Sequence, residues 1–442
     1  MENNKRYRLH PAVFYRTYAD DVILYHTESQ KVFTFNSTAA DVLECFNEWN
    51  GLTEAMKTLK NIYNVEDNLE FENSISDFVE ELCDKNILEI EYTQVESKDQ
   101  LESEFATNLL KVNQLYSVTF ELTYKCNEKC RHCYIADSDK TEISTEMIKS
   151  ILDELAELNA LNIVFTGGEI FTRKDIWEIL DYAYKKHFVI DIFTNGNLLN
   201  ADGIIHLKSI WPRTVHFSVY SHIPEKHDSI TQVKGSFDKT IRAIKACKLV
   251  NIPVNIKTPI FNETKDDIEG IVDLANSIGV SIELGANITP KKDGNLAPLS
   301  MKIKDEKEDL KVHEEIDRLI KQDNDTEIKT IKGDKICGAG ERSISINPYG
   351  EVFPCNMLQL KIGNLNTETV KSIWQSSSQL KWWRKNNLRT NKKGCEDCKY
   401  FDNCIFCPGE AMMRSNDPFK KYEDACIATQ LASERKNEKG GL

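Results

Sequence analysis

Three cysteines lie close together in the segment Cys126-Asn-Glu-Lys-Cys130-Arg-His-Cys133, at a C-x3-C-x2-C spacing. Thiolates are soft ligands that suit iron–sulfur clusters and zinc. Three of them on one loop would leave one iron of a four-iron cluster without a protein ligand, and chemistry can take place there. The alternative is a structural zinc site with His132 or a distant fourth ligand. No further cysteine follows until Cys247, so the spacing favours the iron–sulfur interpretation.

The neighbouring segments indicate how this loop is positioned. From Tyr116 to Leu122 apolar and polar residues alternate, which predicts a β-strand with one buried face. A second strand is predicted over 162–166, and it runs directly into Gly167-Gly168-Glu169. Both motifs are therefore expected at the ends of strands.

Together the two motifs resemble the signature of radical S-adenosylmethionine (SAM) enzymes, in which an aromatic residue such as His132 precedes the last cysteine. The resemblance implies that Cys126, Cys130 and Cys133 hold a [4Fe-4S] cluster whose open iron is chelated by SAM. In this family a turn like Gly167-Gly168-Glu169 meets the amine of SAM. The glycines allow the backbone to approach, and the carboxylate is an acceptor for the amine.

Composition sets broad limits. A chain of 442 residues is long enough for two to four domains. With 70 acidic and 56 basic residues the net charge is -14, which argues against nonspecific nucleic-acid binding. No stretch is apolar enough for membrane insertion, and no export signal is recognised at the start. The 13 cysteines are therefore expected to be mainly metal ligands in a reducing cytoplasm.

The first 94 residues are expected to form a separate domain. The predicted elements are strands over 20–25, 31–35 and 86–90 and helices over 38–47, 52–63 and 74–85. A hairpin with three helices resembles the RiPP recognition element, a winged-helix-like module of enzymes that modify ribosomally made peptides. The resemblance implies that a precursor's leader peptide adds as a strand to the hairpin edge, against the third helix. A DNA-binding winged helix is the alternative, which the acidic third helix disfavours.

Residues 113–290 alternate between strand and helix patterns, after a charged linker over 96–111. The predicted strands cover 116–122, 162–166, 188–193, 214–220, 253–258 and 281–285, and the predicted helices cover 144–158, 175–186, 237–250 and 265–277. This order implies an α/β fold, a partial (β/α)6 barrel with its active site at the carboxyl ends of the strands.

By resemblance, Asn195 and Ser218 are expected to contact the ribose and carboxylate of SAM, and Lys257 is a further candidate. Polar residues at strand ends also often serve only to bind loop backbone groups, so each assignment has an ordinary alternative. The family often has Ser-Leu-Asp where this chain has Ser218-Val-Tyr-Ser221, which puts an aspartate contact in doubt. Residues 291–335 are highly charged and are predicted to form a solvated bridging region.

The last part of the chain has seven more clustered cysteines. Zinc would be the usual reading of paired C-x2-C motifs taken alone. Their order over residues 336–430 resembles the SPASM domain, although its final spacing is commonly one residue longer than here. The resemblance implies two auxiliary [4Fe-4S] clusters, the first held by Cys337, Cys355 and Cys407 and the second by Cys395, Cys398, Cys404 and Cys426.

Three four-iron clusters would need twelve ligands, and the motifs supply ten cysteines. SAM would occupy one open position. The other is expected on the first auxiliary cluster, because related domains that close it use an extra cysteine, and residues 338–346 have none. We hypothesise that a cysteine thiolate of the substrate peptide binds there, deprotonated by the metal.

The domain order, with segments 166–171 and 337–355, resembles sactionine synthases of the subtilosin-maturing kind. This implies an oxidoreductase-type enzyme that cleaves SAM to methionine and 5′-deoxyadenosine and forms thioether crosslinks in a ribosomal precursor peptide, as in bacteriocin maturation. Its electron donor would be a flavodoxin or ferredoxin.

Other activities stay open at this point. Related enzymes form carbon–carbon crosslinks or β- or γ-carbon thioethers, or epimerise residues. A sulfatase-maturing oxidase shares the barrel and the auxiliary domain but does not need the first 94 residues. A non-catalytic, zinc-bearing peptide scaffold is the alternative from another class.

Overall fold

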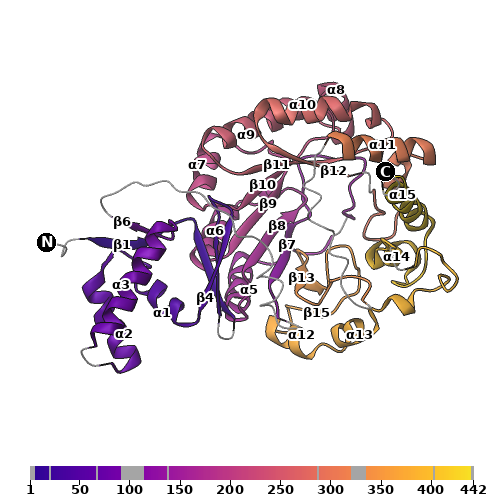
Figure 1. Ribbon diagram of the computed structural model, residues 1–442. Coiled ribbons are helices and arrows are strands. Elements are labelled where there is room, and N and C mark those ends of the chain that lie inside the picture. Colours follow the sequence, from indigo (N-terminus) through magenta and orange to yellow (C-terminus); the bar gives the residue numbers. More distant parts are fainter. Residues whose placement is uncertain are drawn as a thin grey trace.

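The computed structural model describes residues 5–439 apart from 19–20, 66–67, 91–113, 137–138, 286–287, 320–334 and 402–403. An N-terminal domain, a central barrel-like sheet and a C-terminal domain follow one another along the chain (Figure 1). The predicted linker over 96–111 and the domain boundary at residue 94 lie outside the described residues. None of the described helices is long and apolar enough to cross a membrane.

The N-terminal domain contains two small sheets and three helices. Its elements are β1 (Arg6–Leu9), β2 (Val13–Tyr18), β3 (Asp21–His26), β4 (Lys31–Asn36), α1 (Thr38–Glu44), β5 (Asn50–Gly51), α2 (Leu52–Tyr63), α3 (Leu69–Asp84) and β6 (Leu88–Ile90). The predicted hairpin is present as β3 and β4, but β2 joins it in a three-stranded antiparallel sheet. The other sheet has the order β5-β1-β6. The sequence patterns did not predict β1, β2 or β5.

Amphipathic helices build the core of this domain. The inner faces of α1, α2 and α3 place Val42, Leu59 and Leu82 in one cluster with Val22 and Leu24 of β3. Asn68 caps α3 by accepting hydrogen bonds from the backbone amides of the first turn, which satisfies donors that a helix start leaves free.

A nine-stranded sheet forms the centre of the molecule, in the order β12-β11-β10-β9-β8-β7-β13-β14-β15. Its first six strands are β7 (Ser117–Thr123), β8 (Asn162–Gly167), β9 (Val189–Thr194), β10 (Thr214–Ser218), β11 (Val254–Pro259) and β12 (Ser281–Gly285). These six strands are all parallel to their neighbours, so the predicted partial (β/α)6 barrel is confirmed.

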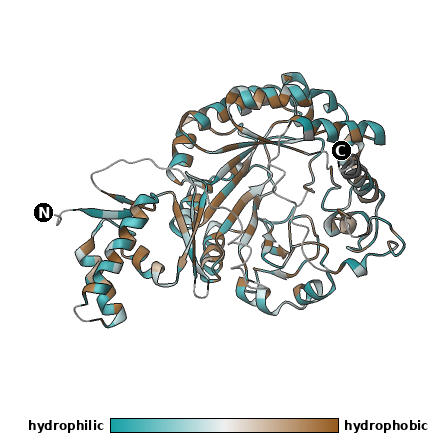
Figure 2. Ribbon diagram, viewed as in Figure 1, coloured by the Kyte–Doolittle hydropathy of each residue, from teal (hydrophilic) through white to brown (hydrophobic). Residues whose placement is uncertain are grey.

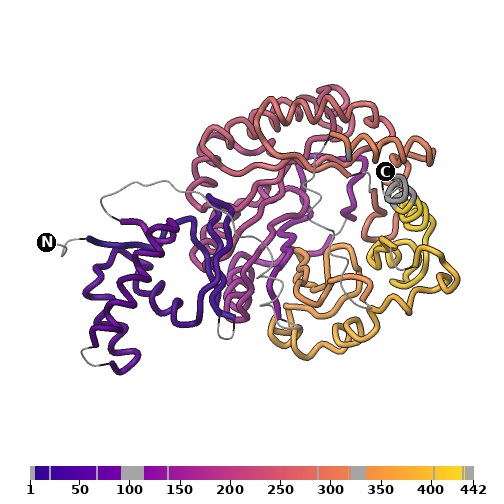
Figure 3. The backbone as a smooth tube through the Cα atoms, in the orientation of Figure 1, coloured from indigo at the N-terminus to yellow at the C-terminus, as the bar shows by residue number. Residues whose placement is uncertain are grey.

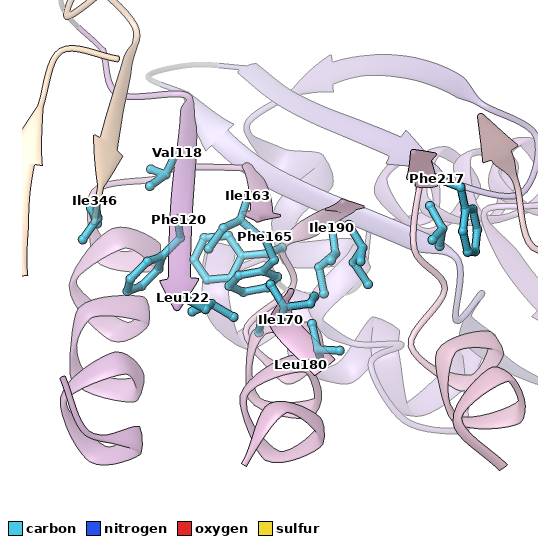
Figure 4. Close-up of a cluster of buried hydrophobic side chains, with 14 of the residues drawn as sticks. Val118, Phe120, Leu122, Ile163, Phe165, Ile170, Leu180, Ile190, Phe217 and Ile346 are labelled. Atoms are coloured by element: carbon cyan, nitrogen blue, oxygen red, sulfur yellow. The ribbon is translucent and has the colours of Figure 1, made fainter. Parts of the chain in front are cut away.

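Helices cover the outer face of the barrel strands (Figure 1). They are α5 (Thr145–Glu157), α6 (Ile176–Lys185), α7 (Ala201–Ser209), α8 (Pro224–Thr231), α9 (Ser236–Leu249) and α10 (Ile268–Ile278). Their surfaces alternate between hydrophobic and hydrophilic residues (Figure 2). Phe120, Phe165, Ile190 and Phe217 point from the strands into the core that these helices cover (Figure 4). The alternating pattern of each strand therefore fixes which face meets the helices.

The C-terminal domain continues the barrel sheet. Its strands and helices are β13 (Ser343–Ile346), β14 (Glu351–Phe353), β15 (Gly363–Asn364), α12 (Val370–Ser376), α13 (Ser378–Asn386), α14 (Pro408–Ser415) and α15 (Glu423–Lys439). Strand β13 pairs in parallel with β7, the strand that leads into the first cysteine motif. Backbone pairing thus joins the C-terminal domain to the strand that precedes the first cysteine motif.

The prediction of a solvated bridge over 291–335 is wrong in part. Helix α11 (Glu306–Leu319) buries Val312 and Ile316 in the main core. The side chain of Lys292 is only 9% exposed, because it is paired with a buried carboxylate. Residues 320–334 lie outside the described part of the chain.

The N-terminal domain lies against one end of the barrel (Figure 3), and its apolar contacts are with the starts of the strands. Phe14, Tyr18 and Ile23 form an apolar cluster with Leu161 and Val189, which lie at the starts of β8 and β9. The hydroxyl of Tyr18 donates a hydrogen bond to the Asn159 carbonyl at 2.7 Å, in the loop before β8. This domain therefore sits at the opposite end of the strands from the two sequence motifs.

Candidate functional site

The first cysteine motif follows β7 and is held by backbone contacts. The amides of Lys129 and Arg131 donate to carbonyls at the end of α8, each at 3.1 Å. Cys126 is exposed, whereas Cys130 and Cys133 are half-buried. The loop is thus fixed on one side and open on the other.

Glu128, inside this loop, is a buried residue that the sequence patterns did not single out. Its side chain accepts a hydrogen bond from the Asn197 amide at 2.5 Å and lies 3.3 Å from the sulfur of Cys130. Burial raises the pKa of Glu128 to about 7. Its hydrogen-bond partner Asn197 is distant in sequence, so only the structure reveals that Glu128 is held in this buried position.

The Gly167-Gly168 turn lies directly against the start of the cysteine loop. The amide of Gly168 donates to the Thr123 carbonyl at 2.7 Å, and that of Glu169 donates to the Lys125 carbonyl at 2.9 Å. A Cβ atom on Gly168 would lie 2.3 Å from the Lys125 oxygen. The glycines therefore allow two backbone segments to touch. Their expected approach to SAM stays a prediction.

Glu169 is completely buried and joins this turn to the end of β9. Its carboxylate accepts hydrogen bonds from the Thr194 hydroxyl at 2.9 Å and from the Asn195 amide at 2.7 Å. A third donor is the Phe171 amide at 3.1 Å. Burial raises the pKa of this carboxyl to about 7. The structure thus gives Glu169 internal partners, and its contact with the SAM amine stays a prediction.

Asn195 links the end of β9 to the cysteine loop. Its side-chain amide donates to the Asn127 oxygen at 2.8 Å and lies 3.9 Å from the sulfur of Cys126. Of the residues predicted for SAM binding, Asn195 and Glu169 are therefore brought together beside the first cysteine.

Ser218, Lys257 and His132 lie in different surroundings. Ser218 is half-buried at the end of β10 and hydrogen-bonds the Tyr220 hydroxyl. Lys257 is its partner on β11 and forms an ion pair with Glu283 of β12. His132 packs between the rings of Tyr220 and Phe261, at centroid distances of 4.7 and 4.9 Å. Among the described residues, its Nδ1 is buried without a hydrogen-bond partner.

The donor set is suited to an iron–sulfur group. Burial raises the pKa of the half-buried Cys130 thiol well above its usual value, so a bound cation would stabilise its thiolate. Within the described part of the chain, no three His, Cys, Asp or Glu side chains converge where a single metal ion would bind. Each cysteine of a four-iron cluster binds a different iron, so such ligands do not need to converge on one point.

Cys337, Cys355 and Cys407 come together in the C-terminal domain. The Cys337 thiol interacts electrostatically with both others, and burial raises its pKa to about 12. The side chain of Asn387 holds the Cys337 backbone, with bonds of 3.3 and 2.7 Å to its amide and carbonyl. The amide of Cys407 donates to the Tyr422 hydroxyl at 3.3 Å. This trio matches the set predicted for the first auxiliary cluster.

The other four cysteines form a second, more open group. Cys395 interacts electrostatically with Cys398, Cys404 and Cys426. Cys398 and Cys426 are exposed, and Cys395 and Cys404 are half-buried. The predicted division of the seven cysteines into three and four therefore corresponds to two groups in space. That each group binds a cluster stays a prediction.

Sequence profiles of three families match the chain. The radical SAM superfamily matches residues 120–275, an iron–sulfur cluster-binding (SPASM) domain matches 337–399, and coenzyme PQQ synthesis protein D (PqqD) matches 21–88. These ranges fall on the barrel, the C-terminal domain and the N-terminal domain.

Three curated relatives illustrate the range of similar proteins. The antilisterial bacteriocin subtilosin biosynthesis protein AlbA of Bacillus subtilis is 30% identical over 299 residues, which cover 65% of this chain and 66% of AlbA, just under two thirds. The AdoMet-dependent heme synthase of Methanosarcina barkeri is 24% identical over 70% of this chain and 95% of that protein. The mycofactocin maturase MftC of Mycolicibacterium smegmatis is 26% identical over 65% of this chain and 76% of its own.

Solved structures share the fold at low identity. SuiB of Streptococcus suis, bound to its precursor peptide SuiA, has a TM-score of 0.60 and 17% identity, covering 95% of this chain and 99% of SuiB. The protein anSMEcpe with bound AdoMet has a TM-score of 0.55 and 17% identity, covering 73% of this chain and 99% of its own. The protein described here therefore combines a radical SAM domain with a PqqD-type domain, the RiPP recognition element, before it and a SPASM domain after it, which is the organisation of radical SAM/SPASM peptide maturases.

Proposed function

We propose that this protein forms thioether crosslinks between a cysteine sulfur and a carbon atom of a ribosomal precursor peptide. The relatives support peptide modification, because AlbA takes part in subtilosin biosynthesis and SuiB has been solved with a precursor peptide. Similarity to heme synthases and mycofactocin maturases means that the thioether has to be argued from this chain's own residues.

The trio of Cys337, Cys355 and Cys407 carries the proposal. Three thiols lie together, and no fourth cysteine is predicted to join them. A cavity of about 420 Å³ adjoins Cys407. It has apolar walls from Ile288 and Leu299 and charged ones from Arg414. Such a space suits a peptide segment, and a cysteine of that peptide would supply the missing thiolate.

SAM and the iron–sulfur groups, when bound, supply the one-electron chemistry that removes hydrogen from an unactivated carbon. The chain's own residues hold the cysteine loop in place and shield it from water. Glu169 and Asn195 fix the turn and the strand end beside Cys126. His132, Tyr220 and Phe261 form an apolar wall beside the same loop, which excludes water.

Recognition of the leader peptide is assigned to the N-terminal domain. Among the described strands β4 pairs only with β3, so its other edge is available for an added strand. Phe33 and Phe35 of β4 are half-buried, and Phe35 contacts Phe78 of α3 with a centroid distance of 5.3 Å. An apolar leader segment would bind between this edge and α3.

Tandem mass spectrometry of the precursor tests the proposal. The precursor is incubated without oxygen with protein, SAM and dithionite, and free thiols are then alkylated. A thioether predicts loss of two hydrogen atoms per linkage and a cysteine that resists alkylation. Loss of two hydrogens with a fully alkylated cysteine would show a carbon–carbon crosslink instead, and an unchanged mass would indicate epimerisation or no reaction.

Two variants control this experiment. Cys407→Ala removes a member of the trio and is expected to abolish the crosslink while SAM cleavage persists. Cys247→Ala changes a buried core cysteine outside the motifs and is expected to keep the crosslink. Loss of product in both variants would mean that the assay reports folding rather than the trio.

A further inference from the structure

A buried carboxylate at the end of β7 collects three polar side chains. Glu121 is 1% exposed, and both of its oxygens accept hydrogen bonds from Lys292, at 2.6 and 2.5 Å. The hydroxyls of Tyr124 and Tyr134 donate to the same carboxylate at 2.9 and 3.2 Å. The ammonium group of Lys292 also donates to the Tyr124 hydroxyl at 3.0 Å.

These two tyrosines flank the first cysteine motif, because Tyr124 precedes Cys126 and Tyr134 follows Cys133. Lys292 lies near both rings, with its nitrogen 5.2 Å from each centroid. Its backbone amide donates to the Tyr134 carbonyl at 2.9 Å. Both ends of the cysteine loop are therefore attached to Lys292.

The same group also reaches the first auxiliary trio. The Asn356 side chain hydrogen-bonds the Tyr134 hydroxyl, and Asn356 directly follows Cys355. Burial raises the pKa of the Cys355 thiol, and the positive charge of Lys292 opposes this increase. Lys292 thus interacts both with the first cysteine loop and with Cys355 of the first auxiliary trio.

A charge pair in such a position is costly unless every donor and acceptor is satisfied. Here the lysine and the carboxylate are both satisfied by near neighbours. A hydrophobic pair would fill the same space without the desolvation cost, but it would not join three segments by directed bonds. The geometry thus favours a positioning role over a purely stabilising one.

We propose that Lys292 is a positioning residue that joins the Cys126–Cys133 loop to the Cys355 segment through Glu121, Tyr134 and Asn356 and holds a positive charge between the loop and that segment. The inference rests on the ligand sets of the proposed function. It goes beyond that function because Lys292, Glu121 and Tyr124 are not among the residues proposed to bind a metal or to contact SAM.

Hydrogen–deuterium exchange of the full chain tests the connection without any substrate. Lys292→Met removes the charge and the donors at similar volume. We expect exchange to become about tenfold faster in segments 124–134 and 355–358 together. Lys292→Arg keeps the charge and should restore much of the protection. The exposed Lys307→Met serves as the matched control. Faster exchange confined to 288–301 would contradict the proposal.

A redox titration of the reconstituted protein tests whether the positive charge of Lys292 acts on the first auxiliary centre. Reduced clusters carry more negative charge, so Lys292→Met is expected to move the midpoint potential of the first auxiliary centre to more negative values, whereas Lys292→Arg leaves it near that of the wild type. An unchanged midpoint potential in Lys292→Met would overturn the claim that the charge of Lys292 acts on this centre.

If Lys292→Met does not fold, Tyr134→Phe removes a single hydroxyl from the network and is expected to loosen segment 355–358 in the same exchange experiment. Unchanged exchange there would contradict the connection. Neither readout depends on the product, so a protein that makes no thioether could still confirm the role of Lys292.

Discussion

The N-terminal and C-terminal domains are attached to the barrel in different ways. The N-terminal domain packs side chains such as Phe14 and Tyr18 against the starts of the strands. The C-terminal domain adds β13 to the edge of β7 and so becomes part of the same sheet. One attachment is a packed surface, and the other is a backbone hydrogen-bond ladder.

This difference matches the tasks that we propose for the two domains. A leader-binding domain only has to hold the peptide, and it lies at the end of the barrel away from the motifs. A domain that supplies further cluster ligands has to be held in a fixed position relative to the first motif. The β7–β13 pairing provides that connection, and the role that we propose for Lys292 would add to it. If the N-terminal domain binds the leader as proposed, the precursor needs a spacer long enough to pass from one end of the barrel to the other.

The largest expected effect concerns the shared sheet. Ile346 of β13 is completely buried, and Ile346→Asp would place a charge in the main core. We expect a loss of about 4 kcal/mol in the free energy of unfolding, with loss of bound iron from the whole protein. Denaturant unfolding and iron analysis measure both. Ser372→Asp, on the exposed side of α12, is the control and should unfold like the wild type.

The packed surface should respond differently. Phe14→Ala removes a buried ring that contacts Tyr184 edge-on, and we expect it to weaken docking of the N-terminal domain by about 3 kcal/mol. Limited proteolysis should cut this domain away faster, while iron content and SAM cleavage stay unchanged. Ile62→Ala, at an exposed position of the same domain, should have no effect. Iron loss in Phe14→Ala would remove the distinction between the two attachments.

The N-terminal domain is also expected to lose stability in acid. Burial lowers the pKa of His26 to about 4 from 6.5, and its Nδ1 accepts a hydrogen bond from the Ser29 amide. The unfolded chain therefore binds more protons, and stability falls as the pH decreases from 6.5 towards 4. Thermal unfolding and proteolysis across this range measure the effect. His26→Gln should make the susceptibility of this domain less dependent on pH, and an unchanged pH profile would contradict this explanation.

The smallest expected effect concerns leader binding. Phe33→Ala at the open edge of β4 is expected to weaken binding of a leader peptide about tenfold, without altering SAM cleavage. Fluorescence anisotropy with a labelled leader measures the affinity. Leu69→Ala, at the exposed start of α3, is the control. Equal affinities for all three proteins would place the leader elsewhere.

Local patterns predicted the parts of this fold that depend on local sequence. Helix α2 and strand β12 begin and end where the patterns placed them, and the cysteine loop follows its strand as expected. Strand β1 was missed because its partners β5 and β6 are distant in the chain. Strand β2 was missed because its own residues do not alternate between buried and exposed, although its partner β3 is adjacent. Glu128 and Lys292 were missed for a related reason, since each is defined by a partner far away in sequence.

Whether a precursor cysteine completes the trio is tested most directly by electron paramagnetic resonance of a variant that keeps only the trio among the motif cysteines. In this variant alanine replaces the other seven, which are Cys126, Cys130, Cys133, Cys395, Cys398, Cys404 and Cys426. We expect the reduced spectrum to change when the precursor peptide is added and to stay the same with a precursor whose cysteines are replaced by serine. Identical spectra with both peptides would contradict the proposal that a cysteine of the precursor peptide completes the trio of Cys337, Cys355 and Cys407.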